Sequence, residues 1–316
     1  YRDRDAEYGE TIEVRTGPRL DHVLAIQAPA VEPGASLRYR IVLYDSPGHV
    51  HHGEIASADQ AGEARELVID PAGEDREGDA GPWRTLQFAV DRALPGDRIV
   101  LRDGLYTGLT TVRRGGIPGA PLIIEAEHSG RATLDAGKLR RNAIRMNETP
   151  HVTLRGIEVR WFHRRGIQIT DSPHVTLENM TFWNENLIKG RRQGGGFYAR
   201  RSPGLAVRGC LFFYMNEGFC ILDSPGFHLE GNTVATQVHR GCRIIFSTRG
   251  SALINNCFAF TGNEHLAIYE RREDWETFTC DYNNYPAHLR PIAKRRPPLS
   301  RSKIASACVF PRRTGS

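Results

Sequence analysis

The stretch GIQITDSPHVTLENMTF, residues 166–182, returns in outline as GFCILDSPGFHLEGNTV, residues 218–234. Both stretches place Asp-Ser-Pro between two short segments in which apolar residues alternate with polar ones. A period of two is the pattern of a β-strand that buries one face. Proline at the junction removes no hydrogen bond from either strand, because it lies between them. The stretch therefore predicts a strand, a turn and a second strand.

This turn recurs along the chain at a regular interval. It is found at Thr149-Pro150, Ser172-Pro173, Ser202-Pro203, Ser224-Pro225 and Arg249-Gly250, which gives steps of 23, 30, 22 and 25 residues. A third short strand is expected in each unit, and no helical pattern separates the units. Three short strands in about 22–25 residues fit one rung of a parallel β-helix, whereas propeller blades take about 40 residues.

The repeat also predicts which residues stack on one another from rung to rung. Before the turn, the inward pairs are Ile167/Ile169, Phe197/Ala199, Phe219/Ile221 and Ile244/Phe246. Before the third strand, the column is Ile157, Met180, Cys210, Asn232 and Cys257. Cys210 and Cys257 would lie two rungs apart, about 9–10 Å, which exceeds the reach of a disulfide. Both are therefore expected to be reduced core residues.

Residues 82–106, PWRTLQFAVDRALPGDRIVLRDGLY, predict a helix followed by a strand. The apolar positions of the helix fall on one face, and Pro-Gly-Asp at 95–97 ends it. An amphipathic helix over residues 83–94 would cover the exposed edge of the first rung, as a terminal cap of a repeat protein must.

Several short motifs resemble those of a known group of proteins. They are Pro82-Trp83-Arg84-Thr85-Leu86-Gln87, Ala89-Val90, Pro95-Gly96-Asp97, Gly104-Leu105-Tyr106 and Asp281-Tyr282-Asn283. Together they resemble the right-handed parallel β-helix proteins of the pectate-lyase-like superfamily, nearest to the group of alginate lyases and chondroitinase B (polysaccharide lyase family six). The resemblance covers about residues 66–285 and implies an all-β fold of about 7–9 rungs. It also implies a protein that acts on acidic polysaccharides outside the cell or in the periplasm.

Three regions are expected along the chain. Residues 1–65 alternate as short strands between Gly-Pro and Glu-Pro-Gly turns, which predicts a small antiparallel, sandwich-like β-domain. Residues 66–285 form the β-helix with its capping helix. Residues 286–316 carry eight basic residues and no acidic one, and are expected to be disordered. No nucleic-acid partner is expected from this tail, and the absence of a run of about 18 apolar residues argues against a membrane span.

Binding residues are expected on the outward side of the strand before each turn. The nearer outward column is Arg145, Gln168, Tyr198, Cys220 and Ile245, and the farther one is Asn147, Thr170, Arg200, Leu222, Ser247 and Tyr269. Arg145, Gln168, Tyr198, Arg200 and Tyr269, with Arg192 and Arg240 near the loops, are predicted to bind substrate. The guanidinium group of arginine can donate two parallel hydrogen bonds to a carboxylate. A column that contains several arginines therefore suits a polymer of sugar acids.

The step of 30 residues points to the place of the chemistry, because it adds about seven residues in the loop 184–196. Loops inserted into repeats gather on one side and commonly carry binding sites. This loop holds the one Lys of the repeating body, Lys189, together with Arg191. Neighbouring rungs would bring His239 and Arg243 to the same edge.

Cleavage of a uronate polymer by β-elimination needs a neutralised carboxylate, a base for the adjacent C–H and an acid for the leaving oxygen. The resembled lyases combine a Lys and an Arg with a Ca²⁺ ion held by acidic and Asn side chains. This resemblance implies Lys189, Arg191, Arg243 and His239 as catalytic candidates, and Asn184, Glu185 and Glu217 as calcium ligands. Two alternatives stay open, a β-helix that binds glycan without cleaving it and a glycoside hydrolase, which would need paired carboxylates.

Overall fold

The computed structural model describes most of the region from Ala64 to Asn284 and short parts of the flanking segments. The described ranges are 36–39, 42–44, 50–52, 56–59, 64–77, 81–138, 142–184, 187–188, 191–192, 194–235, 240–259, 264–269, 276–284 and 292–294. The chain divides into two compact units, residues 1–62 and residues 63–316.

The first unit contains two antiparallel strand pairs among its described residues. β1 (Ser36–Tyr39) pairs with β4 (Ala56–Asp59), and β2 (Val42–Tyr44) pairs with β3 (Val50–His52). These pairs fit the antiparallel character expected for residues 1–65. The predicted strands near residues 11–29 lie outside the described residues, so the sandwich-like domain stays a prediction.

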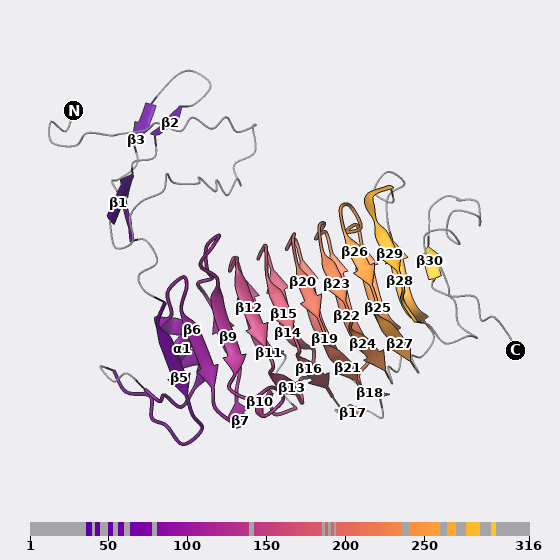
Figure 1. The fold of residues 1–316 in the computed structure, drawn as a ribbon, viewed down its shortest axis with the longest axis horizontal. Helices are drawn as coiled ribbons and strands as arrows, with labels where there is room; N and C mark the ends of the chain where they lie inside the picture. Colours follow the sequence, from indigo (N-terminus) through magenta and orange to yellow (C-terminus); the bar gives the residue numbers. More distant parts are fainter. Residues whose placement is uncertain are drawn as a thin grey trace, which may run out of the picture. The chain divides into compact units, whose positions relative to one another are not determined.

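The second unit is built from three parallel sheets, which we call sheet I, sheet II and sheet III (Figure 1). Each rung passes through sheet I, then sheet II, then sheet III, and each strand pairs in parallel with the equivalent strand of the next rung. The sheets have eight, nine and seven strands. The predicted parallel β-helix and its number of rungs are confirmed.

Sheet I has the order β30-β28-β25-β22-β19-β14-β11-β8. Its strands are β8 (Thr110–Val112), β11 (Asn142–Asn147), β14 (Arg165–Thr170), β19 (Gly195–Arg200), β22 (Glu217–Leu222), β25 (Arg240–Ile245), β28 (Glu264–Tyr269) and β30 (Ile292–Lys294). β30 lies inside the segment expected to be a disordered tail, and it pairs with β28. The rest of residues 286–316 lies outside the described residues, so the expectation for the tail stays a prediction.

Sheet II and sheet III complete each rung. Sheet II contains β5 (Glu66–Ile69), β6 (Arg98–Leu101), β9 (Leu122–Ala126), β12 (Val152–Arg155), β15 (Thr176–Glu178), β20 (Ala206–Arg208), β23 (His228–Glu230), β26 (Ala252–Ile254) and β29 (Thr279–Asp281). Sheet III contains β7 (Gly104–Thr107), β10 (Ala132–Asp135), β13 (Glu158–Arg160), β16 (Thr181–Trp183), β21 (Leu211–Phe213), β24 (Thr233–Ala235) and β27 (Cys257–Ala259).

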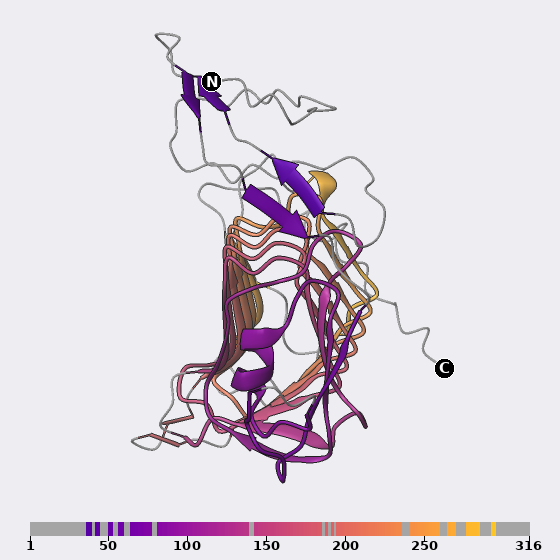
Figure 2. The same cartoon turned by 90° about the vertical axis from the view of Figure 1, so that its left-hand side faces the viewer.

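Helix α1 (Leu86–Arg92) lies at the open end of the stack, as the sequence predicts (Figure 2). The Thr85 side chain caps its first turn by accepting the N–H of Phe88, which satisfies one of the unpaired donors at a helix start. Its apolar face, which includes Ala89, is buried. At its other end the carboxylate of Asp97 accepts the N–H of Leu94 at 2.7 Å. Among the described residues, no helix is long and apolar enough to cross a membrane.

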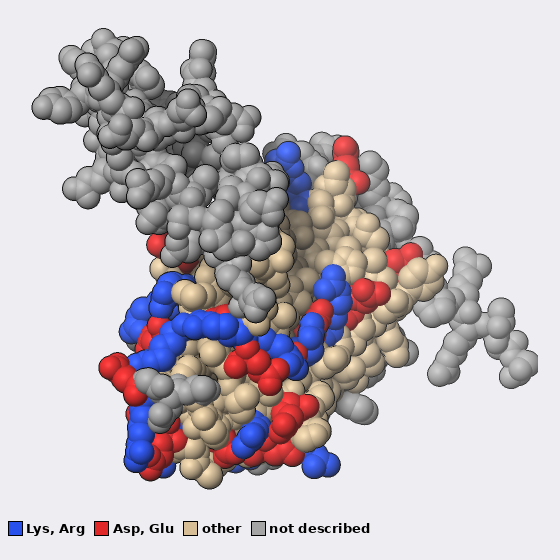
Figure 3. Space-filling model, turned by 60° about the vertical axis from the view of Figure 1, so that its left-hand side comes forward, with Lys and Arg blue, Asp and Glu red and all other residues tan. Residues whose placement is uncertain are grey.

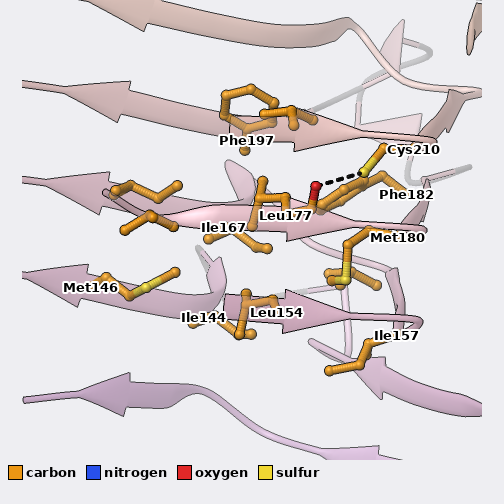
Figure 4. Close-up of a cluster of buried hydrophobic side chains, with 14 of the residues drawn as sticks. Ile144, Met146, Leu154, Ile157, Ile167, Leu177, Met180, Phe182, Phe197 and Cys210 are labelled. Atoms are coloured by element: carbon orange, nitrogen blue, oxygen red, sulfur yellow. Dashed lines mark hydrogen bonds between the residues drawn. The ribbon is translucent and has the colours of Figure 1, made fainter. Parts of the chain in front are cut away.

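The core consists of apolar side chains that stack column by column along the rungs (Figure 4). Ile144, Ile167, Phe197 and Phe219 occupy equivalent positions on successive strands of sheet I and are almost wholly buried. Aromatic rings also stack across rungs, for example Phe197 on Phe219 at 5.1 Å between ring centroids. The inward columns before the turn are thus confirmed for these rungs.

A ladder of hydroxyl groups closes the corner between sheets I and II. Ser172 Oγ accepts the N–H of Thr149 at 3.0 Å, and Ser202 Oγ accepts that of Ser172 at 3.1 Å. Ser224 and Ser247 continue the ladder at 2.9 and 3.0 Å. Each serine hydroxyl also donates to a carbonyl two residues earlier. The repeated Ser of the Asp-Ser-Pro motif therefore satisfies a buried backbone N–H group of the preceding rung.

The fifth rung departs from the predicted register. β25 pairs with β22 so that Cys242 and Ile244 take the inward positions, and Phe246 is 46% exposed. The predicted inward pair Ile244/Phe246 was therefore wrong by two residues. The reason is that Ser247, rather than the Arg-Gly dipeptide two residues later, occupies the ladder position in this turn.

Asparagine side chains form a second ladder, at the corner between sheets II and III. The Oδ1 atom of Asn232 accepts the N–H of Cys210, and Asn256 does the same for Asn232, at 2.9 and 3.0 Å. Asn283 continues the ladder at 2.9 Å. Asn256 thus takes the column position predicted for Cys257, which instead pairs with Thr233 on sheet III and is half-buried. That prediction was wrong by one residue, while both cysteines are free thiols as expected.

Candidate functional site

The outer face of sheet I carries most of the described residues that the sequence singles out. Arg145 on β11, Gln168 on β14 and Tyr198 on β19 are neighbours in register. The column continues through Cys220 on β22 to Arg243 on β25. Arg243 thus occupies the position predicted for Ile245, because the fifth rung is offset by two residues.

The farther outward column lies two residues along each strand. It runs through Asn147, Thr170, Arg200, Leu222, Ile245 and Tyr269. Ser247, which the sequence places in this column, belongs to the hydroxyl ladder instead. Tyr269 is in the predicted column, although its side chain lies outside the described part of the chain.

Several predicted site residues, or their side chains, lie outside the part of the chain that the structure describes. Lys189, Glu185 and His239 lie outside the described residues, so their roles stay predictions. Arg191 and Arg192 belong to β18 (Arg191–Arg192), which pairs antiparallel with β17 (Leu187–Ile188) inside the inserted loop. Arg240 begins β25. The side chains of these three arginines are likewise outside the described set.

A buried ion cluster lies next to the predicted column. The Glu217 side chain is 6% exposed and accepts a hydrogen bond from Arg165 Nη1 at 3.2 Å. It also accepts hydrogen bonds from Nε of Arg243 and, at 3.0 Å, from Nη2 of Arg243. Burial of a carboxylate is costly unless it is paired and hydrogen-bonded. Two guanidinium groups meet this requirement, and the shared carboxylate holds both of them at fixed positions on the outer face.

Glycine residues follow the first position of β19 and β22, next to this cluster. A Cβ atom on Gly196 would lie 2.6 Å from the carbonyl oxygen of Gly218, and one on Gly218 would lie 2.5 Å from that of Gly241. The β19–β22–β25 pairing omits these glycines. Sheet I therefore begins each of these rungs with a close approach of backbones that a larger residue would prevent, just after Glu217.

Arg165 also faces the ring of Tyr198, with its Cζ atom 5.5 Å from the ring centroid. A guanidinium over an aromatic ring is a favourable cation–π arrangement. The Tyr198 side chain is half-buried, so its phenol can reach a ligand lying on sheet I. The cluster thus brings two guanidinium groups, one carboxylate and one phenol to neighbouring strands.

Two further arginines on the same face are exposed. Arg145 and Arg200 make no ion pair or side-chain hydrogen bond with any residue in the described part of the chain. By contrast, arginines on sheet II alternate with glutamates, and Figure 3 shows positive and negative atoms interleaved on the face it brings forward. The paired residues on sheet II are Glu66, Arg98, Glu125, Arg155, Glu178 and Arg208. The face of sheet I therefore has unused cationic hydrogen-bond donors that sheet II lacks.

Asn142 is a buried residue that the sequence does not single out. It begins β11, is 2% exposed, and donates through Nδ2 to Gln168 Oε1 at 2.9 Å. Its Oδ1 atom has no hydrogen-bond partner within the described residues. A buried acceptor without a partner is uncommon in a folded protein and requires an explanation. No sequence motif marks it, since one Asn at a strand start has many structural uses.

Burial keeps one nearby thiol out of the chemistry. Cys242 lies inside the rung next to Phe219, and burial raises its pKa well above the ordinary value of 9.0. The thiolate is the reactive form of cysteine. Cys242 therefore acts as a small apolar core residue.

Asn184 and Glu217, the two predicted calcium ligands that the structure describes, are both engaged with other groups. Both carboxylate oxygens of Glu217 accept hydrogen bonds from arginine side chains. Asn184 is buried and donates its amide to the carbonyl oxygen of Phe162 at 2.7 Å. A divalent cation at Glu217 would have to displace two guanidinium groups of the same sign. The described residues thus do not fit calcium at this place, and the calcium prediction has no support from them.

One other trio could in principle offer ligands to a metal, within the residues that the structure describes. Asp103, Glu127 and His128 have ligand atoms within 4.8 Å of one another, and all three are exposed. They lie where sheet II passes to sheet III, and Arg131 is 3.5 Å from Asp103. Exposed acidic groups of this kind are common, so the trio adds nothing to the site on sheet I.

Comparisons with known proteins agree with this architecture. The family described as "Right handed beta helix region" matches residues 141–285. An alginate lyase from Paenibacillus sp. str. FPU-7 is 13% identical, with a TM-score of 0.51 over 74% of this chain and 91% of that chain. Its likeness and the three parallel sheets show the fold, a right-handed parallel β-helix.

Two other solved structures are similar at a lower TM-score. Pectate lyase Pel9A is 17% identical, with a TM-score of 0.47 over 72% of this chain and 74% of that chain. The GH136 lacto-N-biosidase from Eubacterium ramulus is 12% identical, with a TM-score of 0.49 over 69% of this chain and 50% of that chain. No curated protein matches the sequence.

Proposed function

We propose that this protein is a carbohydrate-active β-helix protein that binds an acidic polysaccharide across the outer face of sheet I and cleaves it by β-elimination. The observation that supports this most is the cluster of Arg165, Glu217, Arg243 and Tyr198, with Arg145 and Arg200 exposed on the same face. A polymer with repeated carboxylates would use several of these arginines at once. Because such polymers occur outside the cytoplasm, the proposal also places the protein in the extracellular or periplasmic space.

The arginines supply the first requirement of β-elimination, which is to neutralise the carboxylate of the sugar acid. A guanidinium group binds a carboxylate through two parallel hydrogen bonds and stays charged at all working pH values. Neutralisation stabilises the negative charge that develops when the C–H bond next to the carboxylate loses its proton. Arg243 is the candidate for this role, because Glu217 holds it on the outer face of sheet I.

Tyr198 is the candidate for the proton transfer. In the reaction a base takes the proton at C5, the electron pair forms the C4–C5 double bond, and the C4–O bond breaks. The leaving oxygen then receives a proton, so one group can act first as base and then as acid. Tyr198 lies beside Arg165, whose Cζ atom is 5.5 Å from the centroid of the tyrosine ring. Lys189 and His239 remain predicted candidates for the same step.

A glycoside hydrolase is a weaker alternative, because hydrolysis needs two carboxyl groups about 5–10 Å apart. Glu217 is the one acidic residue in the sequences of β11, β14, β19, β22 and β25, and it is bound by two arginines. Binding without cleavage is the stronger alternative. The ion pairs of Glu217 with Arg165 and Arg243 favour this alternative. Such a cluster can support the binding residues Arg145 and Arg200 without taking part in chemistry.

The test is incubation of the protein with alginate, pectate and glycosaminoglycans while recording the ultraviolet absorbance of unsaturated uronates. Cleavage of at least one polymer is expected, and Arg243→Met should lower the rate about 100-fold or more, as loss of a group that stabilises the developing charge does. Arg208→Met, on the ion-pair ladder of sheet II, is the matched control and should keep the wild-type rate. A chelator should leave the rate unchanged.

The outcomes separate the alternatives. No absorbance with any polymer, but retention of the protein on one of them through Arg145 and Arg200, would support the binding protein. New reducing ends without absorbance would support hydrolysis. A rate that disappears with chelator and returns with Ca²⁺ would contradict the role proposed for the arginines.

A further inference from the structure

A row of aromatic side chains lies on sheet III and in the segments that follow its strands. Trp183 on β16 and Phe213 on β21 are neighbours in register, and their rings stack at 6.3 Å with an angle of 16° between planes. Trp161 meets Trp183 edge to face at 5.3 Å, and Tyr214 meets Phe213 in the same way at 5.4 Å. We call these four residues the aromatic row.

The aromatic row is accessible to a ligand. Trp161, Trp183 and Phe213 are partly exposed, and Tyr214 is 37% exposed. Leu211, two residues before Phe213 on β21, is 36% exposed beside them. Large apolar groups gathered in one exposed patch mark a binding surface more often than scattered ones do. The interior has no need of these rings, because the core columns of sheet III are filled by other residues.

Small residues follow the aromatic row on the next strands of sheet III. After Phe213, the next two strands of sheet III carry Ala235 and Ala259 at the same register position. Two successive small residues therefore follow Phe213 over about 10 Å at strand spacing.

The charges along the row balance one another. The ammonium of Lys138 lies 3.9 Å from the ring centroid of Trp161, and the guanidinium of Arg160 lies 5.7 Å from that of Trp183. Arg160 is also 3.1 Å from Asp135 and 3.8 Å from Glu158. Two positive and two negative groups therefore accompany the rings. Carboxylates of this kind can accept hydrogen bonds from the hydroxyl groups of a ligand.

We propose that the aromatic row is a second glycan-binding surface, which holds sugar rings by stacking, separate from the arginine cluster on sheet I. A sugar ring presents a flat face of C–H groups that packs on an aromatic ring, while its hydroxyl groups point sideways to polar neighbours. The small residues Ala235 and Ala259 that follow Phe213 fit this shape. The surface would hold a polymer chain irrespective of what the sheet I face does to it.

A single-stranded nucleic acid is the other macromolecule that stacks on aromatic rows. It requires a positively charged groove along its phosphates, and its binding weakens steeply with salt. The aromatic row has no net positive charge among its described neighbours, and Trp183 and Phe213 stack on each other rather than leave a space between them. These observations favour a glycan, whose stacking contacts do not depend on counterion release.

The test is affinity electrophoresis of the full chain in gels that contain alginate, pectate, xylan or single-stranded DNA, at low and high salt. At least one glycan should retard the protein, and the double variant Trp183→Ala/Phe213→Ala should weaken this binding about 10-fold or more, the scale of two lost aromatic contacts. High salt should change the ratio of wild-type to double-variant affinity, which measures the contribution of Trp183 and Phe213, by less than about 2-fold, unlike a phosphate-dominated interaction.

Three variants make the result specific. Leu105→Ala removes a side chain that is 47% exposed on β7 of the same sheet and should bind as the wild type. Trp183→Tyr keeps an aromatic ring and should keep most of the affinity. Arg243→Met should lose cleavage but keep the salt-resistant binding, which separates this surface from the function proposed for sheet I.

The proposal is overturned if no glycan retards the wild-type protein, or if the double variant binds every glycan as the wild type does. It is also overturned if binding disappears at high salt, or if single-stranded DNA binds more tightly than any glycan through Trp183. Far-ultraviolet circular dichroism and the thermal midpoint should match the wild type for the variants of Trp183, Phe213 and Leu105, because these side chains lie outside the core.

Discussion

Two corners of the β-helix differ in how much their sequence and length change from one rung to the next. The corner between sheets I and II repeats the same solution in successive rungs, with a hydroxyl of Ser172, Ser202, Ser224 or Ser247 accepting a backbone N–H of the rung before. The corner between sheets III and I has the inserted β17–β18 pair, the aromatic row on one side and the arginine cluster on the other. The uniform corner holds the stack together, and the variable corner has room for function.

The physical reason lies in the backbone. A buried N–H group must find an acceptor, and a stack offers one only in the neighbouring rung, so the uniform corner permits few substitutions. A loop that points to water finds its partners in solvent. Its length and composition can therefore change without loss of the rungs beneath it.

The largest expected effect comes from a glycine where the variable corner enters sheet I. In Gly218→Val, the new Cβ would lie 2.5 Å from the carbonyl oxygen of Gly241 and 2.9 Å from Cγ1 of Val234. Overpacking against backbone costs about 1–3 kcal/mol or more, so we expect the free energy of unfolding to fall by at least about 3 kcal/mol or folding to fail. Urea unfolding measures it.

The matched control for this variant is Gly108→Val, at a glycine where a Cβ would meet nothing within 4 Å. Its φ of 124° still disfavours a side chain, so its cost isolates backbone strain from steric overlap. Equal losses in the two variants would contradict the claim that the entry to sheet I is limited by the close approach of backbones.

An intermediate effect is expected in the uniform corner. Ser202→Ala removes the acceptor of the Ser172 N–H group and leaves it buried without a partner. Such a group costs about 1–3 kcal/mol of unfolding free energy, which thermal or urea unfolding can resolve. Ser202→Thr keeps the hydroxyl, as Thr149 does in the first rung of the ladder, and should lose less than half as much. Equal stability of Ser202→Ala and the wild type would contradict the claim that the need to satisfy buried N–H groups keeps the corner between sheets I and II uniform.

The smallest effect depends on pH and also concerns the uniform corner. His151 and His174 stack at 4.8 Å after their prolines, and burial, with a smaller contribution from the charge of His174, lowers the pKa of His151 below 6.5. The unfolded chain therefore binds more protons than the folded one near pH 6. Stability is full above pH 6.5 and falls as the pH drops toward the folded pKa.

His151→Asn removes this titration, and Asn tolerates the positive φ of 51° at this position. We expect the difference in thermal midpoint between pH 7 and pH 5 to shrink in the variant by an amount equivalent to less than about 0.5 kcal/mol, as surface substitutions commonly show. A larger pH dependence in the variant than in the wild type would contradict the direction of the pKa shift.

The predictions that rest on the repeat succeeded where each rung is regular and failed where one is not. The Asp-Ser-Pro spacing predicted the strands of rungs from β11 to β22 and their inward residues. It failed at Phe246, because Ser247 rather than the Arg-Gly dipeptide two residues later takes the ladder position, and at Cys257, because Asn256 satisfies a backbone N–H group. Alternation identifies which face a residue occupies, but it does not determine how a turn is spaced.

The candidate site was predicted in part. The outward column of Arg145, Gln168 and Tyr198 follows from strand alternation alone, so the sequence predicted it. Strand alternation could not predict the ion pair between Arg165 and Glu217, because both residues precede the alternating part of their strands. Their pairing spans 52 residues of sequence and exists because β14 and β22 lie two strands apart in one sheet.

The sequence by itself determined the repeat, the parallel β-helix, the capping helix and the corner that tolerates insertion, since these depend on local patterns of apolar residues, Ser, Pro and Gly. The tertiary structure decided which charges meet. It paired Glu217 with Arg165 and Arg243, left Arg145 and Arg200 exposed, and aligned Trp161, Trp183 and Phe213 in a row. Those contacts depend on register and on the stacking of rungs about 4.8 Å apart, which no local pattern contains.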